Sequence, residues 1–176
     1  SFLIKIKNNP SYATGFMLED GRRNLRLWDE QRLTTWFDEF LPSLDLENPE
    51  VVDLQVDSTM YWIQKFDLDG FRHDATKHIP LDFWRKLTRR LKEDRVSKGK
   101  KVYQIGETYG SRDLVNSYIG SGLLDAQFDF NLYFDSRSSF ALQEPSMQVV
   151  ADALEQSLSY YGPHNTMGYM TGNHDQ

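Results

Sequence analysis

The sequence predicts an α/β fold in which short parallel strands alternate with amphipathic helices. Short apolar segments recur along the chain, and most of them end in a group of polar residues. Between them, apolar residues recur at the three- and four-residue spacing of a helix that packs one face on a core. A strand with its helix takes about 30 residues, which agrees with the distance between the segments. This alternation favours a parallel sheet with right-handed crossovers.

The composition narrows the classes of partner. The chain of 176 residues has 20 Lys and Arg against 26 Asp and Glu, which gives a net charge of −6. An acidic chain without a basic cluster argues against nucleic acid as the main partner. The chain has no cysteine, which excludes a disulfide scaffold, a thiolate metal site and a cysteine nucleophile. No apolar run reaches the roughly 18 residues that a membrane span needs, so we expect none.

The first forty-odd residues are expected to be irregular, because turn-forming groups alternate with aromatic residues that follow no period. The first clear helix follows. Asn48 is a typical cap, Pro49 suits the first helical position and Glu50 places an acid in the first turn. We expect this helix to end near residues 65–66 and a strand to follow at 68–72.

The same alternation then repeats. Pro80 opens a second helix, whose apolar residues Phe83, Trp84, Leu87 and Leu91 share one face. A third helix is expected at 149–158. Further strands are expected at 102–105, 124–130 and 167–170.

Three acids follow these strands. Asp74 comes after the first, Glu107 after the second and Asp175 after the fourth. The first two lie about one strand–helix unit apart, and the third about two units further on. In a barrel of parallel strands all carboxyl ends face one rim, so the three carboxylates are expected to share one pocket. Asp129 also ends a strand, but the sequence assigns it no role.

Three carboxylates in one pocket suit the hydrolysis of a glycosidic bond. A retaining enzyme needs a carboxylate nucleophile and a carboxylic acid about 5–5.5 Å apart. A further carboxylate can stabilise the positively charged transition state. Arg72 lies two residues before Asp74 on the same strand face, where it can keep that carboxylate ionised. His73 alternates with both and is expected to be structural.

Four segments resemble the motifs of the α-amylase family, glycoside hydrolase family 13. Residues 69–78 (DGFRHDATKH) resemble its nucleophile motif and 106–109 (GETY) its acid/base motif. Residues 172–175 (GNHD) resemble the motif of its third carboxylate. Residues 41–45 (LPSLD) resemble a less strict signature near the end of the loop domain after the third barrel strand. The motifs occur in family order.

The resemblance implies roles that the residues alone do not give. Asp74 is the expected nucleophile, Glu107 the general acid/base and Asp175 the carboxylate that stabilises the transition state. Arg72 orients Asp74. The implied activity is the retaining hydrolysis of α-1,4-glucans such as starch and maltooligosaccharides, through a covalent glycosyl-enzyme.

The resemblance also implies substrate contacts and a domain plan. His174 is expected to contact sugar hydroxyls where cleavage occurs, and Lys77 and His78 the sugar on the leaving-group side. Residues 1–45 would be the remnant of the loop domain, and 46–176 a partial (β/α)8 TIM barrel that contains the fourth to seventh strands. Family members are often secreted or periplasmic, so the resemblance favours such a location.

Two departures from the family pattern bear on cofactors. The family's first motif, which lies on the third strand, has no match in this chain. Ser43 stands where many α-amylases have an aspartate that binds calcium. No cofactor is therefore predicted: calcium stays open for the intact enzyme, while Ser43 argues against it in this chain.

The alternatives are a transglycosylase or cyclomaltodextrinase-type enzyme of the same family, and a non-catalytic glucan-binding protein on the same fold. A chain with only four barrel strands exposes strand edges and apolar surface. We therefore expect these 176 residues alone to be inactive and to self-associate.

Overall fold

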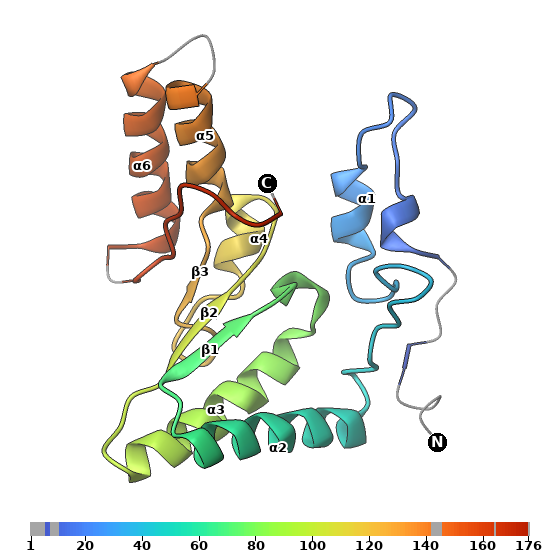
Figure 1. The fold of residues 1–176 in the computed structure, drawn as a ribbon, viewed down its shortest axis with the longest axis vertical. Helices are drawn as coiled ribbons and strands as arrows, with labels where there is room; N and C mark the ends of the chain where they lie inside the picture. The colour runs from blue at the N-terminus through green and yellow to red at the C-terminus, as the bar shows by residue number, and fades with distance from the viewer. Residues whose placement is uncertain (1–5, 8–10, 142–145, 164, 176) are drawn as a thin grey trace. The chain divides into compact units, whose positions relative to one another are not determined.

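The computed structural model describes residues 6–7, 11–141, 146–163 and 165–175. The chain divides into two compact units (Figure 1). The first unit contains residues 1–69 and 77–102, and the second contains 70–76 and 103–176. The predicted domain boundary at residue 45 lies within the first unit and stays a prediction.

Two long helices form the regular part of the first unit. Helix α2 spans Pro49–Phe66 and packs against α3, which spans Leu81–Ser97. The predicted start of α2 is confirmed, since the Asn48 side chain accepts a hydrogen bond from the Glu50 amide at 3.0 Å. The predicted end near residue 66 and the start of α3 after Pro80 are also confirmed.

A buried arginine joins the ends of these two helices. Asp67 caps α2 in the left-handed conformation, with φ of 52°. Arg95 of α3 donates to the Asp67 carboxylate at 2.8 Å and to the Ile63 carbonyl at 2.7 Å. The first hydrogen bond is charge-assisted, and the second adds a side-chain donor to the Ile63 carbonyl, which also accepts from the Asp67 amide at the end of α2.

The N-terminal part of the first unit is largely irregular, as predicted. It contains a 3-10 turn, η2, at Ala13–Gly15 and one short helix, α1, at Leu25–Glu30, which the sequence analysis did not predict. Asn24 caps α1 by accepting a hydrogen bond from the Leu27 amide at 3.1 Å. The Trp36 indole donates to the Lys7 carbonyl at 2.8 Å, so an aromatic side chain joins distant parts of this segment.

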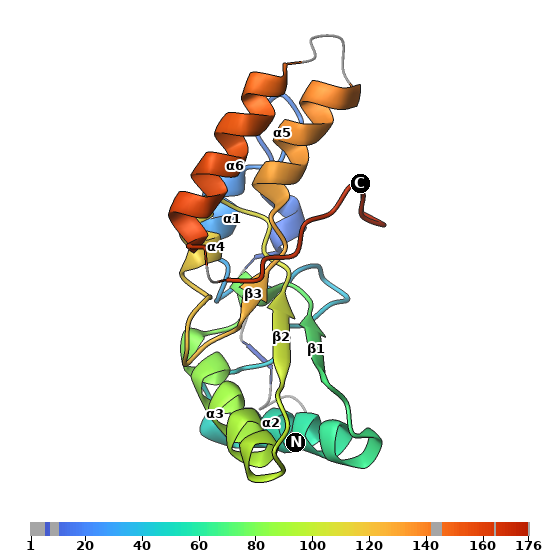
Figure 2. The ribbon, with the colours of Figure 1, turned by 90° about the vertical axis from the view of Figure 1, so that its left-hand side faces the viewer.

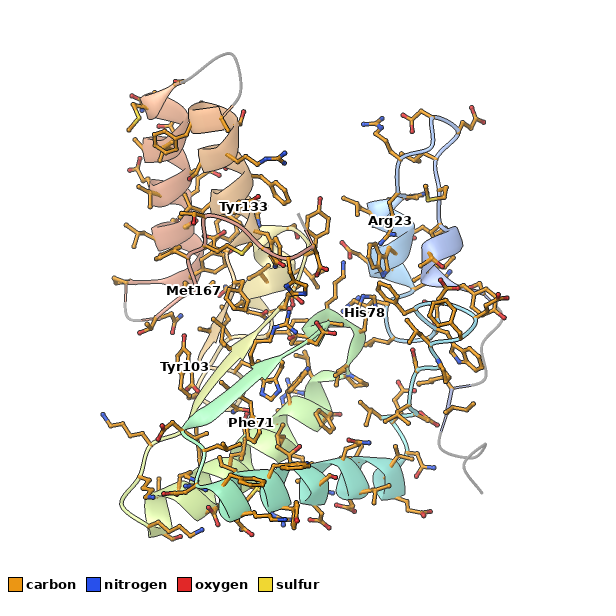
Figure 3. All side chains as sticks on the ribbon, in the orientation of Figure 1. Arg23, Phe71, His78, Tyr103, Tyr133 and Met167 are labelled. Carbon is orange, nitrogen blue, oxygen red and sulfur yellow. The ribbon has the colours of Figure 1, made fainter. Side chains whose placement is uncertain are left out.

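The second unit contains a parallel sheet in the order β1-β2-β3 (Figure 2). Strand β1 spans Gly70–His73, β2 spans Tyr103–Gly106 and β3 spans Ala126–Gln127. Both strand pairs are parallel, which confirms the predicted sheet type. Phe71 on β1 and Tyr103 on β2 are labelled in Figure 3.

Two predicted strands were wrong in extent. The strand predicted at 124–130 is limited to β3, because Asp129 instead caps a helix that begins at Phe130. The Asp129 carboxylate accepts hydrogen bonds from the Leu132 amide at 3.0 Å and the Ser157 hydroxyl at 2.5 Å. The segment predicted as a strand at 167–170 makes only an isolated parallel bridge between Phe128 and Gly168.

Three helices complete the second unit. Helix α4 spans Arg112–Asn116, α5 spans Phe130–Ala141 and α6 spans Met147–Tyr161. Helices α5 and α6 lie side by side (Figures 1 and 2). The helix predicted at 149–158 is confirmed as the central part of α6, whereas α4 and α5 were missed. Of the helices that the structure describes, none combines the length and the apolar character that crossing a membrane requires.

The core of the second unit fixes the segment that leads to the third acidic motif. Val115 of α4, Ala126 of β3 and Tyr161 of α6 are buried together with Met167. Gly168 follows in close contact, since a Cβ atom there would lie 2.5 Å from the Ile105 side chain. A larger residue at 168 would therefore displace the side chains of Ile105 and Phe128, on which this segment packs.

Candidate active site

Strand register makes Asp74 and Glu107 neighbours. His73 and Gly106, the last residues of β1 and β2, are partners in the parallel ladder. Asp74 and Glu107 each follow directly. The ladder continues past the strands, because the Glu107 amide donates to the His73 carbonyl at 2.9 Å. Two acids that follow paired residues of adjacent parallel strands emerge at the same edge of the sheet.

Thr76 holds the turn after β1 against Glu107. The Thr76 amide donates to the Glu107 carbonyl at 2.9 Å, and the Thr76 hydroxyl accepts from the Glu107 amide at 3.1 Å. Thr76 is fully buried. Both the amide and the carbonyl group of Glu107 are thus hydrogen-bonded to the segment that contains Asp74.

One arginine binds both carboxyl groups. Arg72 Nη1 lies 2.6 Å from Asp74 Oδ1, and Arg72 Nη2 lies 2.5 Å from Glu107 Oε2. Such charge-assisted hydrogen bonds fix the position as well as the charge of a carboxylate. The contact of Arg72 with Asp74 was expected from the sequence. Its second contact, with Glu107, was not expected.

The environments of the two acids shift their pKa values in opposite directions. Desolvation by burial raises the pKa of Glu107, and a hydrogen bond with Asp74 acts in the same direction, against the donor from Asn173 and the charge of Arg72. Desolvation opposes ionisation of Asp74, but hydrogen bonds with Glu107 and Arg72 outweigh it and lower the pKa of Asp74. The Glu107 side chain is only 12% exposed, against 76% for Asp74.

The third acidic motif reaches this pair through an asparagine. Asn173 Nδ2 donates to Glu107 Oε1 at 3.1 Å, and Asn173 Oδ1 accepts from the Asp175 amide at 3.0 Å. His174 Nε2 lies 3.5 Å from the Asp175 carboxylate, and both side chains are exposed. The charge of His174 contributes to the low pKa of Asp74. Asn173, Asp175 and Glu107 therefore form one hydrogen-bonded chain.

Asn173 was not among the predicted site residues. It is part of the motif at 172–175 that the sequence analysis identified, but only the histidine and the aspartate were given roles. The signal that could have found it is an amide side chain directly before two polar site residues.

Lys77 and His78 have their partners within the first unit. They lie on η3, a short 3-10 helix at Thr76–His78. Lys77 Nζ lies 2.7 Å from Asp29 Oδ1 and 4.6 Å from the centre of the Trp28 ring. Burial lowers the pKa of Lys77, against the effect of Asp29. The substrate contacts predicted for both residues stay predictions.

An aromatic cluster surrounds His78, which is labelled in Figure 3. Its ring centre lies 5.6 Å from that of Trp28 and 6.1 Å from that of Phe37. Burial, followed by the charge of Lys77, lowers the pKa of His78 to about 4. The Arg23 guanidinium lies 4.3 Å from the centre of the Trp28 ring, so Trp28 contacts two cations, Arg23 and Lys77.

The remaining residues singled out from the sequence have structural contacts. His73 Nε2 lies 3.1 Å from Gln104 Oε1, and burial lowers the pKa of His73 to about 4. The Ser43 hydroxyl donates to the Thr35 carbonyl at 3.0 Å. Within the described part of the chain, no group of three or more His, Asp or Glu side chains is arranged to hold a metal ion.

Comparison with known proteins shows which family the chain resembles. The model of the alpha-amylase catalytic domain matches residues 17–176. Alpha-amylase 2 of Schizosaccharomyces pombe is 32% identical over 136 residues, which cover 77% of this chain and 22% of that protein. The alpha-amylase of Streptomyces lividans is 31% identical over 140 residues, which cover 77% of this chain and 15% of that protein.

A solved structure shows the same fold. The alpha-amylase of Anoxybacillus superposes with a TM-score of 0.78 at 25% sequence identity, over 97% of this chain and 34% of that one. The chain therefore spans well under half the length of the proteins that it matches. From its family motifs and these similarities, the chain belongs to the alpha-amylase family and forms part of a catalytic domain of the TIM-barrel type.

Proposed function

We propose that the intact protein is a retaining glycoside hydrolase that cleaves α-1,4-glucans such as starch and maltooligosaccharides. Asp74 is the nucleophile and Glu107 the general acid/base. One observation carries the proposal: Arg72 holds the two carboxyl groups together while their pKa values are shifted apart. Pairs of titratable groups whose environments separate their pKa values are typical of acid–base catalysis.

In the first step Asp74 attacks the anomeric carbon of the glucose unit, and the glycosidic bond breaks. Glu107 gives its proton to the departing oxygen, so the leaving sugar departs as an alcohol and Glu107 becomes a carboxylate. A low pKa keeps Asp74 ionised for attack, and a raised pKa keeps a proton on Glu107.

In the second step water attacks the same carbon, and the bond to Asp74 breaks. Glu107, now a carboxylate, accepts the proton of that water and returns to its starting state. The anomeric configuration is retained because the carbon is inverted twice. Arg72 stays bonded to both carboxyl groups in the resting site and supplies positive charge when either one is ionised.

The spacing of the two acids supports retention. Carboxyl groups of inverting enzymes lie about 6.5–9.5 Å apart, which leaves room for water between them. Asp74 and Glu107 are bound by the two Nη atoms of one guanidinium group, at 2.6 and 2.5 Å. This arrangement fits the closer pair of a retaining enzyme.

The remaining roles rest on the motif match. Asp175 stabilises the positively charged transition state, and His174 binds sugar hydroxyls at the cleavage point. Lys77 and His78 bind the sugar on the leaving-group side. The strands β1, β2 and β3 correspond to the fourth, fifth and sixth strands of the barrel, and the segment at 167–170 to the seventh. Residues 1–45 belong to the loop domain that precedes them.

Substitutions in the intact protein test the two catalytic roles. Asp74→Asn should lower the rate of starch hydrolysis by a factor on the order of 10⁴ or more. Glu107→Gln should lower it about 10²–10⁴-fold, and much less for formation of the glycosyl-enzyme from α-maltosyl fluoride, whose leaving group needs little protonation. The control is Asp152→Asn on α6, which removes a carboxylate whose hydrogen-bond donor is the Gln148 side chain. Unchanged hydrolysis by Asp74→Asn would exclude this mechanism.

A second candidate is a cyclomaltodextrinase-type or transglycosylating enzyme with the same catalytic pair. This candidate is favoured by the similarity of the chain to the cyclomaltodextrinase of Geobacillus thermopakistaniensis, with which it is 29% identical over 137 residues. Product analysis separates the two: faster turnover of cyclodextrin than of starch, or longer transfer products, supports the second candidate. Oligosaccharide binding by calorimetry without any turnover indicates a non-catalytic glucan-binding protein instead.

We further propose that these 176 residues by themselves are inactive and self-associate. Tyr61, Trp62 and Phe66 of α2 are each about half exposed, and Phe140 and Met147 in the second unit are exposed further. Apolar surface of this kind drives association in water. Light scattering should show oligomers, and a monodisperse monomer with amylase activity would contradict both statements.

A further inference from the structure

We propose that Asn173 is a positioning residue for Glu107. Its side chain holds one oxygen of the Glu107 carboxyl group and connects that group to the segment that contains Asp175. The inference rests on the proposed role of Glu107 as general acid/base. Asn173 Nδ2 lies 3.1 Å from Glu107 Oε1, and Asn173 Oδ1 lies 3.0 Å from the Asp175 amide nitrogen.

The backbone fixes which way the amide of Asn173 points. Its oxygen must face the Asp175 amide, because a backbone N–H can only donate. The nitrogen must then face Glu107. The reversed amide would place its N–H groups against the Asp175 N–H group, and that contact would be unfavourable. Asn173 is therefore oriented as a donor to the acid.

Each oxygen of Glu107 has its own donor. Oε2 is bound by Arg72, which Glu107 shares with Asp74. Oε1 is bound by Asn173, which is neutral and forms no hydrogen bond with Asp74 in the described part of the chain. Arg72 therefore acts on both acids, whereas a change at Asn173 should act mainly on Glu107.

The bond from Asn173 strengthens as the reaction proceeds. A hydrogen bond to a charged acceptor is about twice as strong as one to a neutral acceptor. Glu107 becomes a carboxylate when it protonates the leaving oxygen, so the Asn173 donor stabilises the transition state more than the ground state. The same bond fixes the carboxyl group while the proton is transferred in either direction.

The direction of the pH effect follows from the groups that face Glu107. Arg72 from β1 and the Asn173 amide favour its ionised form, whereas Asp74 and burial favour its protonated form. His174 and Asp175 follow Asn173, and the charge of His174 acts on Asp74. Loss of the Asn173 donor removes a group that favours ionisation, so the pKa of Glu107 rises.

The experiment uses the intact protein with Asn173→Ala and Asn173→Asp. In the pH profile of kcat/KM, the fall on the alkaline side (the alkaline limb) reports loss of the proton of Glu107. In Asn173→Ala this limb should move up by about one pH unit. The shift should be larger in Asn173→Asp, which has the same shape, lacks the donor and adds a negative charge. The rate with starch should fall about tenfold in Asn173→Ala, and less for glycosyl-enzyme formation from α-maltosyl fluoride.

The control is Asn131→Ala. The Asn131 amide donates to the Gly110 carbonyl at the same distance, 3.1 Å, so the control removes an equal bond from the same unit. Its alkaline limb should stay in place. A purely structural role for Asn173 would lower the rate without moving the limb, and that result overturns the inference.

A direct titration separates this inference from the proposed function. Infrared spectra of protein labelled with ¹³C-glutamate, with the spectrum of Glu107→Gln subtracted, report ionisation of Glu107 without any turnover. A higher pKa of Glu107 in Asn173→Ala supports the inference even where the wild type hydrolyses no glucan, which would refute the proposed function alone. An unchanged pKa in an active enzyme refutes the inference alone.

Discussion

Lys77 Nζ forms an ion pair with Asp29 Oδ1 at 2.7 Å, and only 3% of the Lys77 side chain is exposed. The two residues are 48 positions apart in the chain. A charged lysine at such a buried position depends on its partner, because removing one member of a buried pair leaves an uncompensated charge. The pair therefore ties the irregular segment around α1 to the residues that follow β1 in the chain.

The first prediction concerns Asp29→Asn, which should destabilise the intact protein by about 2 kcal/mol or more at pH 7. The pKa of Lys77 is already lower in the folded than in the unfolded protein because of burial. Between these two values the unfolded state binds more protons, so this lysine makes stability rise with pH. Without Asp29 the pKa of Lys77 in the folded protein falls further. The variant should therefore lose less free energy of unfolding at about pH 10 than at pH 7. Urea unfolding at both pH values measures it.

The matched control for this pair is Asp82→Asn on α3. Asp82 pairs with Arg85 at 2.7 Å, but its side chain is 91% exposed. Exposed pairs contribute only about 0–1 kcal/mol. An equal loss in the two variants would show that the Lys77 pair has no special role.

A second prediction concerns Arg72→Met and the pH dependence of the intact enzyme. Arg72 favours the ionised form of both Asp74 and Glu107. Its removal should raise both pKa values. In the proposed mechanism the acid limb of the pH profile reports ionised Asp74 and the alkaline limb reports protonated Glu107, so both limbs should move to higher pH. Arg72→Lys keeps the charge but loses the forked geometry, and its limbs should move less. Limbs that move in opposite directions would contradict this prediction.

A third prediction tests the close packing directly before Glu107. A Cβ atom at Gly106 would lie 2.6 Å from the Thr76 hydroxyl oxygen and 2.7 Å from Gln127 Oε1. Because Thr76 has a short side chain and is buried, Gly106→Ala should cost about 1–3 kcal/mol of stability and displace Glu107. Gly122→Ala, where no atom lies within 4 Å, is the control. Thermal unfolding and kcat measure the two effects, and an equal response of both variants would refute the packing argument.

Local patterns were sufficient to predict the parts of the fold that depend on local rules. The cap at Asn48 and the apolar face of α3 both appear as predicted, since capping and periodicity depend on nearby residues. Adjacency of Asp74 and Glu107 followed from parallel strands of similar length. The register pair of His73 and Gly106 now explains why these two acids meet.

The missed features have two physical causes. Helix α5 was missed, and only its first residue, Phe130, was read as the end of a strand, because the capping role of Asp129 had no local marker beyond the residue type. The ion pair of Lys77 with Asp29 joins residues far apart in a segment without periodicity, so no local rule predicts it. The roles assigned to Asp74, Glu107, Asp175, Arg72, His174, Lys77 and His78 stay predictions.

The last prediction concerns the backbone of Ala75, the residue between Asp74 and Thr76. Ala75 has φ of 47°, in the left-handed region, which non-glycine residues adopt at a cost. This turn brings Thr76 back to the Glu107 backbone, where two hydrogen bonds hold it. The strain is therefore offset by contacts that also position Glu107, the proposed acid/base.

Two substitutions at Ala75 in the intact protein separate strain from positioning. Ala75→Val places a β-branched residue in the left-handed region and should cost about 1–2 kcal/mol and lower kcat, since relaxation of the turn moves Asp74 and Thr76. Ala75→Gly relieves the strain but increases the conformational entropy of the unfolded chain. The free energy of unfolding of this variant should therefore stay within about 0.5 kcal/mol of the wild type. Ala151→Val on the exposed side of α6 controls for the change of residue type. If Ala75→Val matches this control in both unfolding and kcat, the left-handed turn does not position Asp74 and Glu107.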